Sequence, residues 1–262
     1  MGMIKNSFFL GHGKQKQNHD VTDFKFVDLH AHVLPGIDDG ASDIEASVAL
    51  VRELAANGAT DIFVTPHYVD ETIYTSLRSF NLELLNKLQA AVLDAGLDVR
   101  LHLGNEIYMT PRMIELIETG VVSTLDNSMY VLVELPMSGE FPGYEDILLS
   151  MLRSGYQVIL AHPERYTSFA DDFSLVYRLR DMGVLFQCNI GSFAGQYGKT
   201  VYKMAVRLAR ERMIFGVGSD IHHVHPGLLS DGLRKLSEFY KETELDEILV
   251  GNPGKIVGES ED

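Results

Sequence analysis

Seven short runs of apolar residues recur along the chain, and most of them are followed by a segment with helical periodicity. The runs show little alternation between apolar and polar positions, which is typical of strands buried on both faces. The expected strands are Lys25–Leu29, Asp61–Thr65, Val99–Leu103, Tyr130–Glu134, Val158–Ala161, Val184–Asn189 and Ile214–Gly218. Strands and helices that alternate in this order favour parallel strands joined by right-handed crossovers.

The segments between these strands are amphipathic and predict helices. In Ser42–Asn57, Ser42 and Glu45 stand at the spacing of a capping box, and Gly58 can provide a left-handed residue after the last turn. The other expected helices are Leu77–Ala95, Pro111–Glu118, Tyr144–Ser154, Phe173–Met182, Thr200–Arg212, Ser230–Glu242 and Asp246–Val250.

Together these elements predict an α/β fold, a distorted seven-stranded parallel (β/α)7 barrel of the TIM-barrel-like kind. No stretch rich in Pro, Gly and Ser divides the middle of the chain, so we expect residues 23–262 to form a single catalytic domain after a flexible arm over residues 1–22. A doubly wound open sheet is the competing architecture. No Gly-x-Gly-x-x-Gly sequence follows the first strand, so a dinucleotide-binding fold has no specific support.

Charge and cysteine content narrow the class of protein. A net charge of −15 argues against nucleic acid or an anionic membrane as the main partner. No run approaches the roughly 18 apolar residues of a membrane-spanning helix, and no signal-peptide core is present. The single cysteine, Cys188, permits no internal disulfide and lacks the surroundings of a cysteine-based phosphatase. We therefore expect a cytoplasmic protein whose chemistry does not use a thiol.

Polar residues gather where the expected strands end. Six of the seven strands are followed by His, Asp or Glu, whereas the sixth ends at Asn189 and offers only an amide. In a parallel barrel these ends share one rim, where active sites lie. Taken singly, Glu106 could cap a helix and His67 could be a surface imidazole. Taken together, they predict a metal site, with candidate ligands His30, His32, Asp39, His67, Glu106, Glu134, His162, Asp220 and His222.

The stretch Phe26–Gly40 is the richest of these strand ends. Alternation along a strand predicts Asp28, His30 and His32 on one face, where two imidazoles two residues apart can hold one metal ion. The alternative is an ordinary strand end with surface histidines, followed by an acidic loop.

The candidate ligands combine imidazoles and carboxylates without a thiolate, which suits Mn²⁺, Fe²⁺ or Zn²⁺ and disfavours a structural zinc. Nine ligands suit two or three ions. The positive charge of three divalent ions would exceed the negative charge of the four carboxylates by about two, enough to attract a phosphomonoester. A bound water with a pKa lowered toward ~7 is the expected nucleophile. Arg165 could hold phosphate oxygens, or it could form a salt bridge to Glu164 or to a carboxylate of the rim.

These motifs resemble, in their order, the PHP (polymerase and histidinol phosphatase) superfamily. The matching stretches are Asp-x-His-x-His with Gly-Ile-Asp-Asp-Gly, Thr-Pro-His, Gly-Asn-Glu, Val-Glu-Leu-Pro, Ala-His-Pro-Glu-Arg-Tyr, Gly-Ser-Asp-x-His and a closing Asn-Pro. More narrowly, the chain from about Phe26 to Val257 resembles the manganese-dependent bacterial protein-tyrosine phosphatases of capsule and exopolysaccharide operons.

The resemblance implies a trinuclear site at the mouth of the barrel. One ion would be held by His30, His32, Glu106 and Asp220; a second by Glu106, Glu134 and His162; and a third by Asp39, His67 and His222. Asp28 would orient an imidazole.

The resemblance also implies the reaction. Arg165 would clamp the phosphate, and Asp220 and His222 would act beside it as catalytic residues. The implied substrate and partner is phosphotyrosine on the tyrosine-rich tail of a capsule-regulating kinase. A small phosphate such as histidinol phosphate, or a silent scaffold that binds the kinase, remains an alternative. A nuclease role is disfavoured by the charge of −15. The sequence does not decide whether the protein forms a homo-oligomer, because the arm or helix Leu77–Ala95 could pack against a second copy.

One departure from the relatives concerns the stretch after Asp220. Relatives place an arginine a few residues after this motif, whereas here His223 and His225 follow, and the next arginine is Arg234. Either histidine could replace the second phosphate contact or act as a general acid. Both could equally be plain surface residues.

Overall fold

The computed structural model describes residues 24–139 and 141–258, and the expected arm over residues 1–22 lies outside this part of the chain. All seven expected strands form, with boundaries shifted by at most two residues. The strands are β1 (Phe26–Ala31), β2 (Ala59–Val64), β3 (His67–Tyr68), β4 (Arg100–Leu103), β5 (Glu106–Tyr108), β6 (Tyr130–Glu134), β7 (Gln157–Ala161), β8 (Leu185–Asn189) and β9 (Gly216–Gly218).

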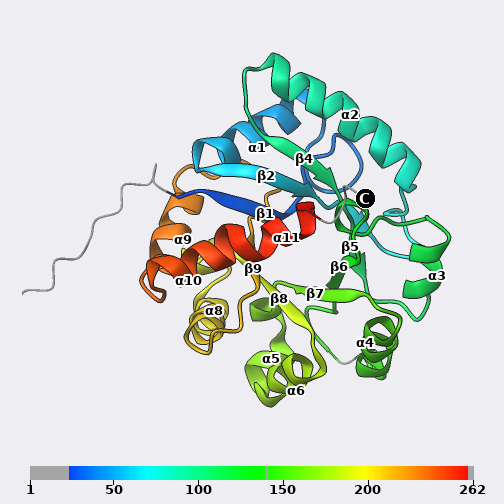
Figure 1. Ribbon diagram of the computed structural model, residues 1–262, viewed down its shortest axis with the longest axis vertical. Helices are drawn as coiled ribbons and strands as arrows, with labels where there is room; N and C mark the ends of the chain where they lie inside the picture. Colours follow the sequence, from blue (N-terminus) through cyan, green and yellow to red (C-terminus); the bar gives the residue numbers. More distant parts are fainter. Residues whose placement is uncertain (1–23, 140, 259–262) are drawn as a thin grey trace, which may run out of the picture.

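The strands curl into a closed parallel barrel (Figure 1). Pairing gives the orders β1-β2-β4 and β3-β5-β6-β7-β8-β9, and every pair is parallel. The interruption between β2 and β3 falls at Pro66, which has no amide hydrogen to donate to a ladder. We therefore count β2 with β3, and β4 with β5, as one interrupted barrel strand each. The barrel closes where a parallel bridge joins Ala31 to Ile221, just after β9. The competing open sheet is wrong.

The helices surround the barrel, apart from α11, which crosses its axis in the view of Figure 1. None of the helices within residues 24–139 and 141–258 combines the length and apolar character that crossing a bilayer requires. The helices are α1 (Ile44–Ala56), α2 (Arg78–Asp94), α3 (Met113–Glu118), α4 (Tyr144–Arg153), α5 (Thr167–Asp171), α6 (Ser174–Met182), α7 (Ile190–Phe193), α8 (Lys199–Arg210), α9 (Leu228–Ser237), α10 (Glu242–Asp246) and α11 (Asn252–Gly258).

Helix α1 begins differently from the sequence prediction. The residue before the first turn is Asp43, whose Oδ1 accepts a hydrogen bond from the amide of Ala46 at 2.8 Å. The hydroxyl of Ser42 donates to Asp43 instead of capping the helix. The expected capping box of Ser42 and Glu45 is therefore wrong, because a carboxylate one residue later accepts the same kind of amide bond.

Apolar side chains fill the barrel interior and close one of its ends. Ile256 of α11 packs into this interior cluster, while a second and larger cluster lies between the strands and the surrounding helices. Helix α11 therefore seals the barrel and leaves the polar rim at the carboxyl ends of the strands open. The interior cluster consists of Val27, Leu29, Phe63, Leu125, Leu132, Ile159, Ala161 and Ile256.

Candidate metal centre

The barrel brings all nine candidate ligands together at one rim. Ligand atoms form four overlapping groups, and within each group the atoms lie within 4.8 Å of one another. Because His30, His32, His67 and Glu106 each belong to two groups, the groups form one continuous cluster. The groups are His32 with Asp39, His67 and His222; His30 with His32 and Asp220; His30 with Glu106 and His162; and His67 with Glu106 and Glu134.

This grouping differs from the division implied by the resemblance, because His30 also stands with Glu106 and His162, and Glu134 stands with His67 instead of His162. His32, expected with His30, Glu106 and Asp220, also stands with Asp39, His67 and His222. The rings of His32 and His222 stack with centroids 4.1 Å apart, which places His32 between two parts of the cluster.

His30 of β1 and His32, which follows the end of that strand, face one another across the centre of the cluster. Their Nε2 atoms are 2.9 Å apart, and both side chains are completely buried. The Nδ1 of His30 lies 3.1 Å from the side-chain oxygen of Gln187, and the Nδ1 of His32 lies 2.8 Å from Asp38. Each Nδ1 can therefore carry the proton and donate it, which leaves both Nε2 lone pairs directed at the same point. A divalent cation fits such a pair of donors.

Glu106 lies at the middle of the carboxylates. Its Oε1 is 2.9 Å from Nε2 of His162, and its Oε2 is 3.2 Å from Nε2 of His30 and 2.8 Å from Nδ1 of His67. Burial opposes its charge, but the charge of His30 and the hydrogen bonds of His162 and His30 hold the pKa of Glu106 well below its usual range. An ionised carboxylate whose two oxygens face different imidazoles is suited to bridge two ions.

Glu134 shows the opposite shift. Burial and the nearby charges of Glu106 and Asp220 raise its pKa to about 9. Three carboxylates thus repel one another in a site with little water. Divalent cations would relieve this repulsion, so the charge of the cluster fits a metal centre as well as its geometry does.

The comparisons with known proteins agree with this geometry. The family model for capsular polysaccharide synthesis, CpsB/CapC, matches residues 26–258. The chain belongs to the CpsB/CapC family. It is 30% identical to CapC of Staphylococcus aureus over 223 residues, which cover 83% of this chain and 87% of that protein. It is 28% identical to the tyrosine-protein phosphatase CpsB of Streptococcus pneumoniae over 238 residues, which cover 88% of this chain and 98% of that one.

A solved structure of the CpsB/CapC family has the same fold. This structure belongs to a set that covers YwqE of Bacillus subtilis and CpsB of Streptococcus pneumoniae, two proteins described as unique metal-dependent tyrosine phosphatases. The TM-score is 0.77 at 25% identity, and the match covers 89% of this chain and 94% of the other.

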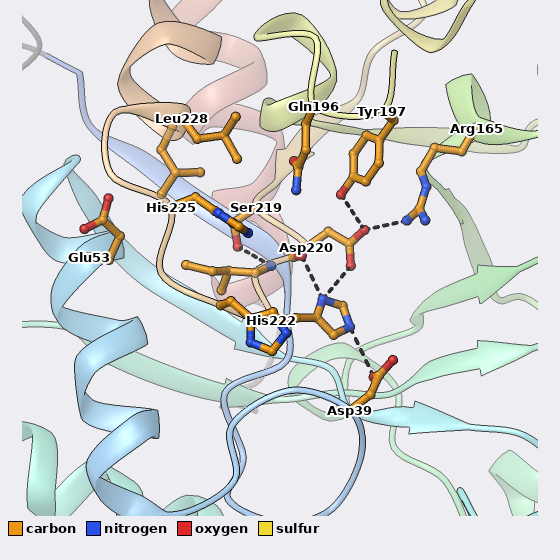
Figure 2. Close-up of a pocket in the computed structure, with 13 residues that line it drawn as sticks. Asp39, Glu53, Arg165, Gln196, Tyr197, Ser219, Asp220, His222, His225 and Leu228 are labelled. Atoms are coloured by element: carbon orange, nitrogen blue, oxygen red, sulfur yellow. Dashed lines mark hydrogen bonds and ion pairs between the residues drawn. The ribbon is translucent and has the colours of Figure 1, made fainter.

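In this CpsB/CapC chain, Arg165 meets the cluster through Asp220 (Figure 2). The Nη1 of Arg165 lies 2.7 Å from Oδ2 of Asp220, and its guanidinium stacks 4.4 Å from the ring centre of Tyr197. The hydroxyl of Tyr197 lies 3.3 Å from the same Oδ2. Of the alternatives for Arg165, the salt bridge to a rim carboxylate is therefore present. It also points the guanidinium toward the site.

A pocket of about 380 Å³ opens beside Asp220 and His222 and is lined by Arg165 and Tyr197. His223 and His225 line it too, so neither of them is remote from the site. Glu53 also contributes to its wall, but Figure 2 shows it on α1, well apart from Asp220. The pocket gives a substrate access to the polar rim of this CpsB/CapC chain.

Asp28 does not orient an imidazole as expected. Its Oδ1 accepts hydrogen bonds from the backbone amides of His30, at 3.1 Å, and Ser219, at 2.8 Å. The register explains this, since Asp28 pairs with Ile62 but Ala31 pairs with Val64, so β1 has a bulge. The bulge breaks the alternation between Asp28 and His30, and the carboxylate satisfies an amide beside it.

Two candidate ligands have a left-handed backbone that non-glycine residues seldom adopt. The φ angle is 33° at His162 and 51° at Asp220, each immediately after or near a strand end. Such conformations cost roughly 1–3 kcal/mol and concentrate at functional sites. Here they turn the two side chains from the strand direction into the cluster.

Sequence reasoning assigned no supporting role to several residues that contact the candidate ligands. Gln187, Asn189 and Asp38 hydrogen-bond to candidate ligands, and Tyr197 contacts both Arg165 and Asp220. Gln187 and Asn189 had a signal, because both occupy the same face of a predicted strand that ends at the rim. Tyr197 had none, because it lies in a glycine-flanked loop without periodicity.

Proposed function

We propose that this chain is a metal-dependent tyrosine-protein phosphatase of capsular polysaccharide synthesis that removes phosphate from phosphotyrosine on a protein. The observation that carries the proposal is the convergence of nine imidazoles and carboxylates at one rim, beside a pocket lined by Arg165. Membership of the CpsB/CapC family supports the activity and the biological process.

The chain's own residues provide binding and orientation. Histidines and carboxylates of the four groups would hold two or three ions, which we propose to be Mn²⁺, with Fe²⁺ and Zn²⁺ as the competing metals. When bound, the ions supply positive charge for the phosphoryl oxygens and make a water more acidic. Arg165 has guanidinium donors beyond the one directed at Asp220, and these can bind phosphate oxygens.

Asp220 connects the arginine to the ligands. Its Oδ1 lies 3.5 Å from Nε2 of His32, while its Oδ2 accepts from Arg165. The two oxygens therefore serve different sides of the site. We propose that this carboxylate keeps the guanidinium at a set position while the phosphate is bound.

His222 is better placed as a ligand than as a proton donor. Its Nδ1 lies 3.0 Å from the backbone oxygen of Asp220, so Nδ1 carries the proton and Nε2 faces Asp39 at 3.2 Å. Burial and the charge of His32 lower the pKa of His222. A tyrosine leaving group has a pKa of about 10 and needs less help from an acid than an alkyl alcohol does, so phosphotyrosine suits this site.

We further propose that the partner is the phosphorylated tail of a bacterial tyrosine kinase of capsule or exopolysaccharide synthesis. The family's role in capsule synthesis supports this choice. A side chain that ends in a phosphate could enter the pocket of about 380 Å³ from the surface, with the Tyr197 ring beside it.

The test is phosphate release from a phosphotyrosyl peptide in the presence of Mn²⁺, compared with histidinol phosphate at equal concentration. We expect faster turnover of the peptide, loss of activity after chelation, and loss in His32→Ala. We expect iodoacetamide to have no effect, because Cys188 is completely buried. Faster turnover of histidinol phosphate would reassign the substrate. Binding of the kinase tail by a metal-free, inactive protein would instead indicate a scaffold.

A further inference from the structure

Strand β8 differs from the other barrel strands of the described residues because no candidate ligand lies on it or within two residues after it. It carries two amides instead, Gln187 and Asn189, and both are completely buried. Amides that are shielded from water in this way must find partners in the protein. Their partners are the metal ligands.

The two amides form a chain of hydrogen bonds across the site. The oxygen of Gln187 lies 3.1 Å from Nδ1 of His30 and accepts the backbone amide of His162 at 3.3 Å. The nitrogen of Gln187 donates to the oxygen of Asn189 at 2.8 Å, and the nitrogen of Asn189 donates to Oδ2 of Asp220 at 2.7 Å. Each amide nitrogen donates to the next oxygen, so this run of hydrogen bonds has one direction.

The direction of these hydrogen bonds decides which ligand atoms remain available to an ion. A Gln187 oxygen that can only accept keeps one proton of His30 on Nδ1, so Nε2 is the nitrogen whose lone pair is offered to an ion when the ring is neutral. At the other end, Oδ2 of Asp220 is occupied and Oδ1 stays directed at His30, with Oδ1 3.7 Å from Nε2. His30 and Asp220 belong to the same group of ligand atoms.

We propose that Gln187 and Asn189 are positioning residues that fix the tautomer of His30 and the orientation of Asp220 for one metal ion. The proposal rests on the proposed function only in requiring a metal centre. It assigns a role to the end of β8, where the sequence analysis identified only the amide of Asn189.

The packing around β8 leaves Gln187 little freedom. A Cβ atom at Gly218 of β9 would lie 2.5 Å from the Gln187 nitrogen and 2.6 Å from Cβ of His30. Such distances are too short for real side chains, so Gly218 provides the space in which the amide and the imidazole meet. A held side chain of this kind loses little entropy on metal binding.

The experiment compares metal affinity and imidazole tautomer in Gln187→Ala, Gln187→Glu and Asn189→Leu. Calorimetric titration with Mn²⁺ should show affinity reduced about 10- to 100-fold in Gln187→Ala and Asn189→Leu, the range found for partners of metal ligands. Nitrogen NMR of the metal-free protein, followed over a pH series that reaches the neutral imidazole, reports the tautomer, with the His30 signal assigned from its absence in His30→Ala. The control is Asn57→Ala, which removes a buried amide at the end of α1; it should bind Mn²⁺ as the wild type does.

The tautomer separates positioning from a general structural role. We expect the proton of His30 to stay on Nδ1 in Gln187→Glu, which keeps an acceptor, and to be shared between the two nitrogens in Gln187→Ala. Wild-type affinity in both Gln187→Ala and Asn189→Leu would overturn the proposal, as would an unchanged tautomer in Gln187→Ala. If Gln187→Ala does not fold, Asn189→Leu decides the question by its affinity alone. Neither readout uses a substrate, so a wild type that binds Mn²⁺ without phosphatase activity would refute the proposed function and leave this inference standing.

Discussion

Replacing His102 should remove a charge that stabilises the fold over a defined pH range. The ring lies between two carboxylates, with Nε2 2.9 Å from Asp61 on β2 and Nδ1 3.0 Å from Asp126 in the turn Leu125–Asn127. Burial opposes the charge, but the hydrogen bonds to Asp126 and Asp61 prevail and raise the pKa of His102 from 6.5 to about 9. The side chain is 11% exposed, so solvent screens the interaction only weakly.

The magnitude follows from this difference in pKa. An imidazole whose pKa rises on folding adds stability that is complete below the unfolded pKa of 6.5 and disappears as the pH rises through about 9. At pH 7 this amounts to roughly 2–3 kcal/mol, and near pH 9.5 to roughly zero. We therefore expect His102→Gln to lose about this much free energy of unfolding at pH 7 and to approach the wild type at pH 9.5.

The assay is urea unfolding of both proteins between pH 6.5 and 9.5, with a chelator present throughout so that metal binding does not vary. Other groups titrate equally in the two proteins, so the difference between them isolates His102. The double variant with Asp126→Asn checks the partner, because the two losses should be less than additive. A difference that stays constant, or that grows with pH, would show that the ring is neutral in the folded protein.

Three further predictions concern the site. Arg165→Lys should lower kcat/KM for a phosphotyrosyl peptide by about 10- to 100-fold and leave Mn²⁺ affinity unchanged, because an ammonium cannot donate bidentately; equal kcat/KM would remove Arg165 from phosphate binding. Tyr166→Phe should cost about 1–3 kcal/mol in urea unfolding, because its hydroxyl accepts from the amide of Leu135 at 3.0 Å and donates to the oxygen of Ala161 at 2.8 Å; a neutral effect would show that water replaces it. Chelation should lower the melting temperature measured by calorimetry, because it removes a ligand bound only by the folded state; a constant melting temperature would contradict a resident metal.

The strands could be predicted from the sequence because burial on both faces leaves an apolar run. Tyr130–Glu134 was even predicted with its observed boundaries. The two-residue strand β3 and the three-residue strand β5 were not predicted, because segments of that length carry no periodic signal. The choice between a barrel and an open sheet also lay beyond local pattern, since it depends on the contact of β9 with β1.

The chemistry of the rim is determined by the sequence, because parallel strands in a barrel deliver their last residues to one place whatever their detailed packing. The identity of the supporting atoms is decided by tertiary structure alone. Gln187 reaches His30 across 157 positions of the chain, and Asn189 reaches Asp220 across 31. A hydrogen bond acts over about 3 Å. Side chains so far apart in the sequence therefore come within bonding distance only when the barrel has closed around them.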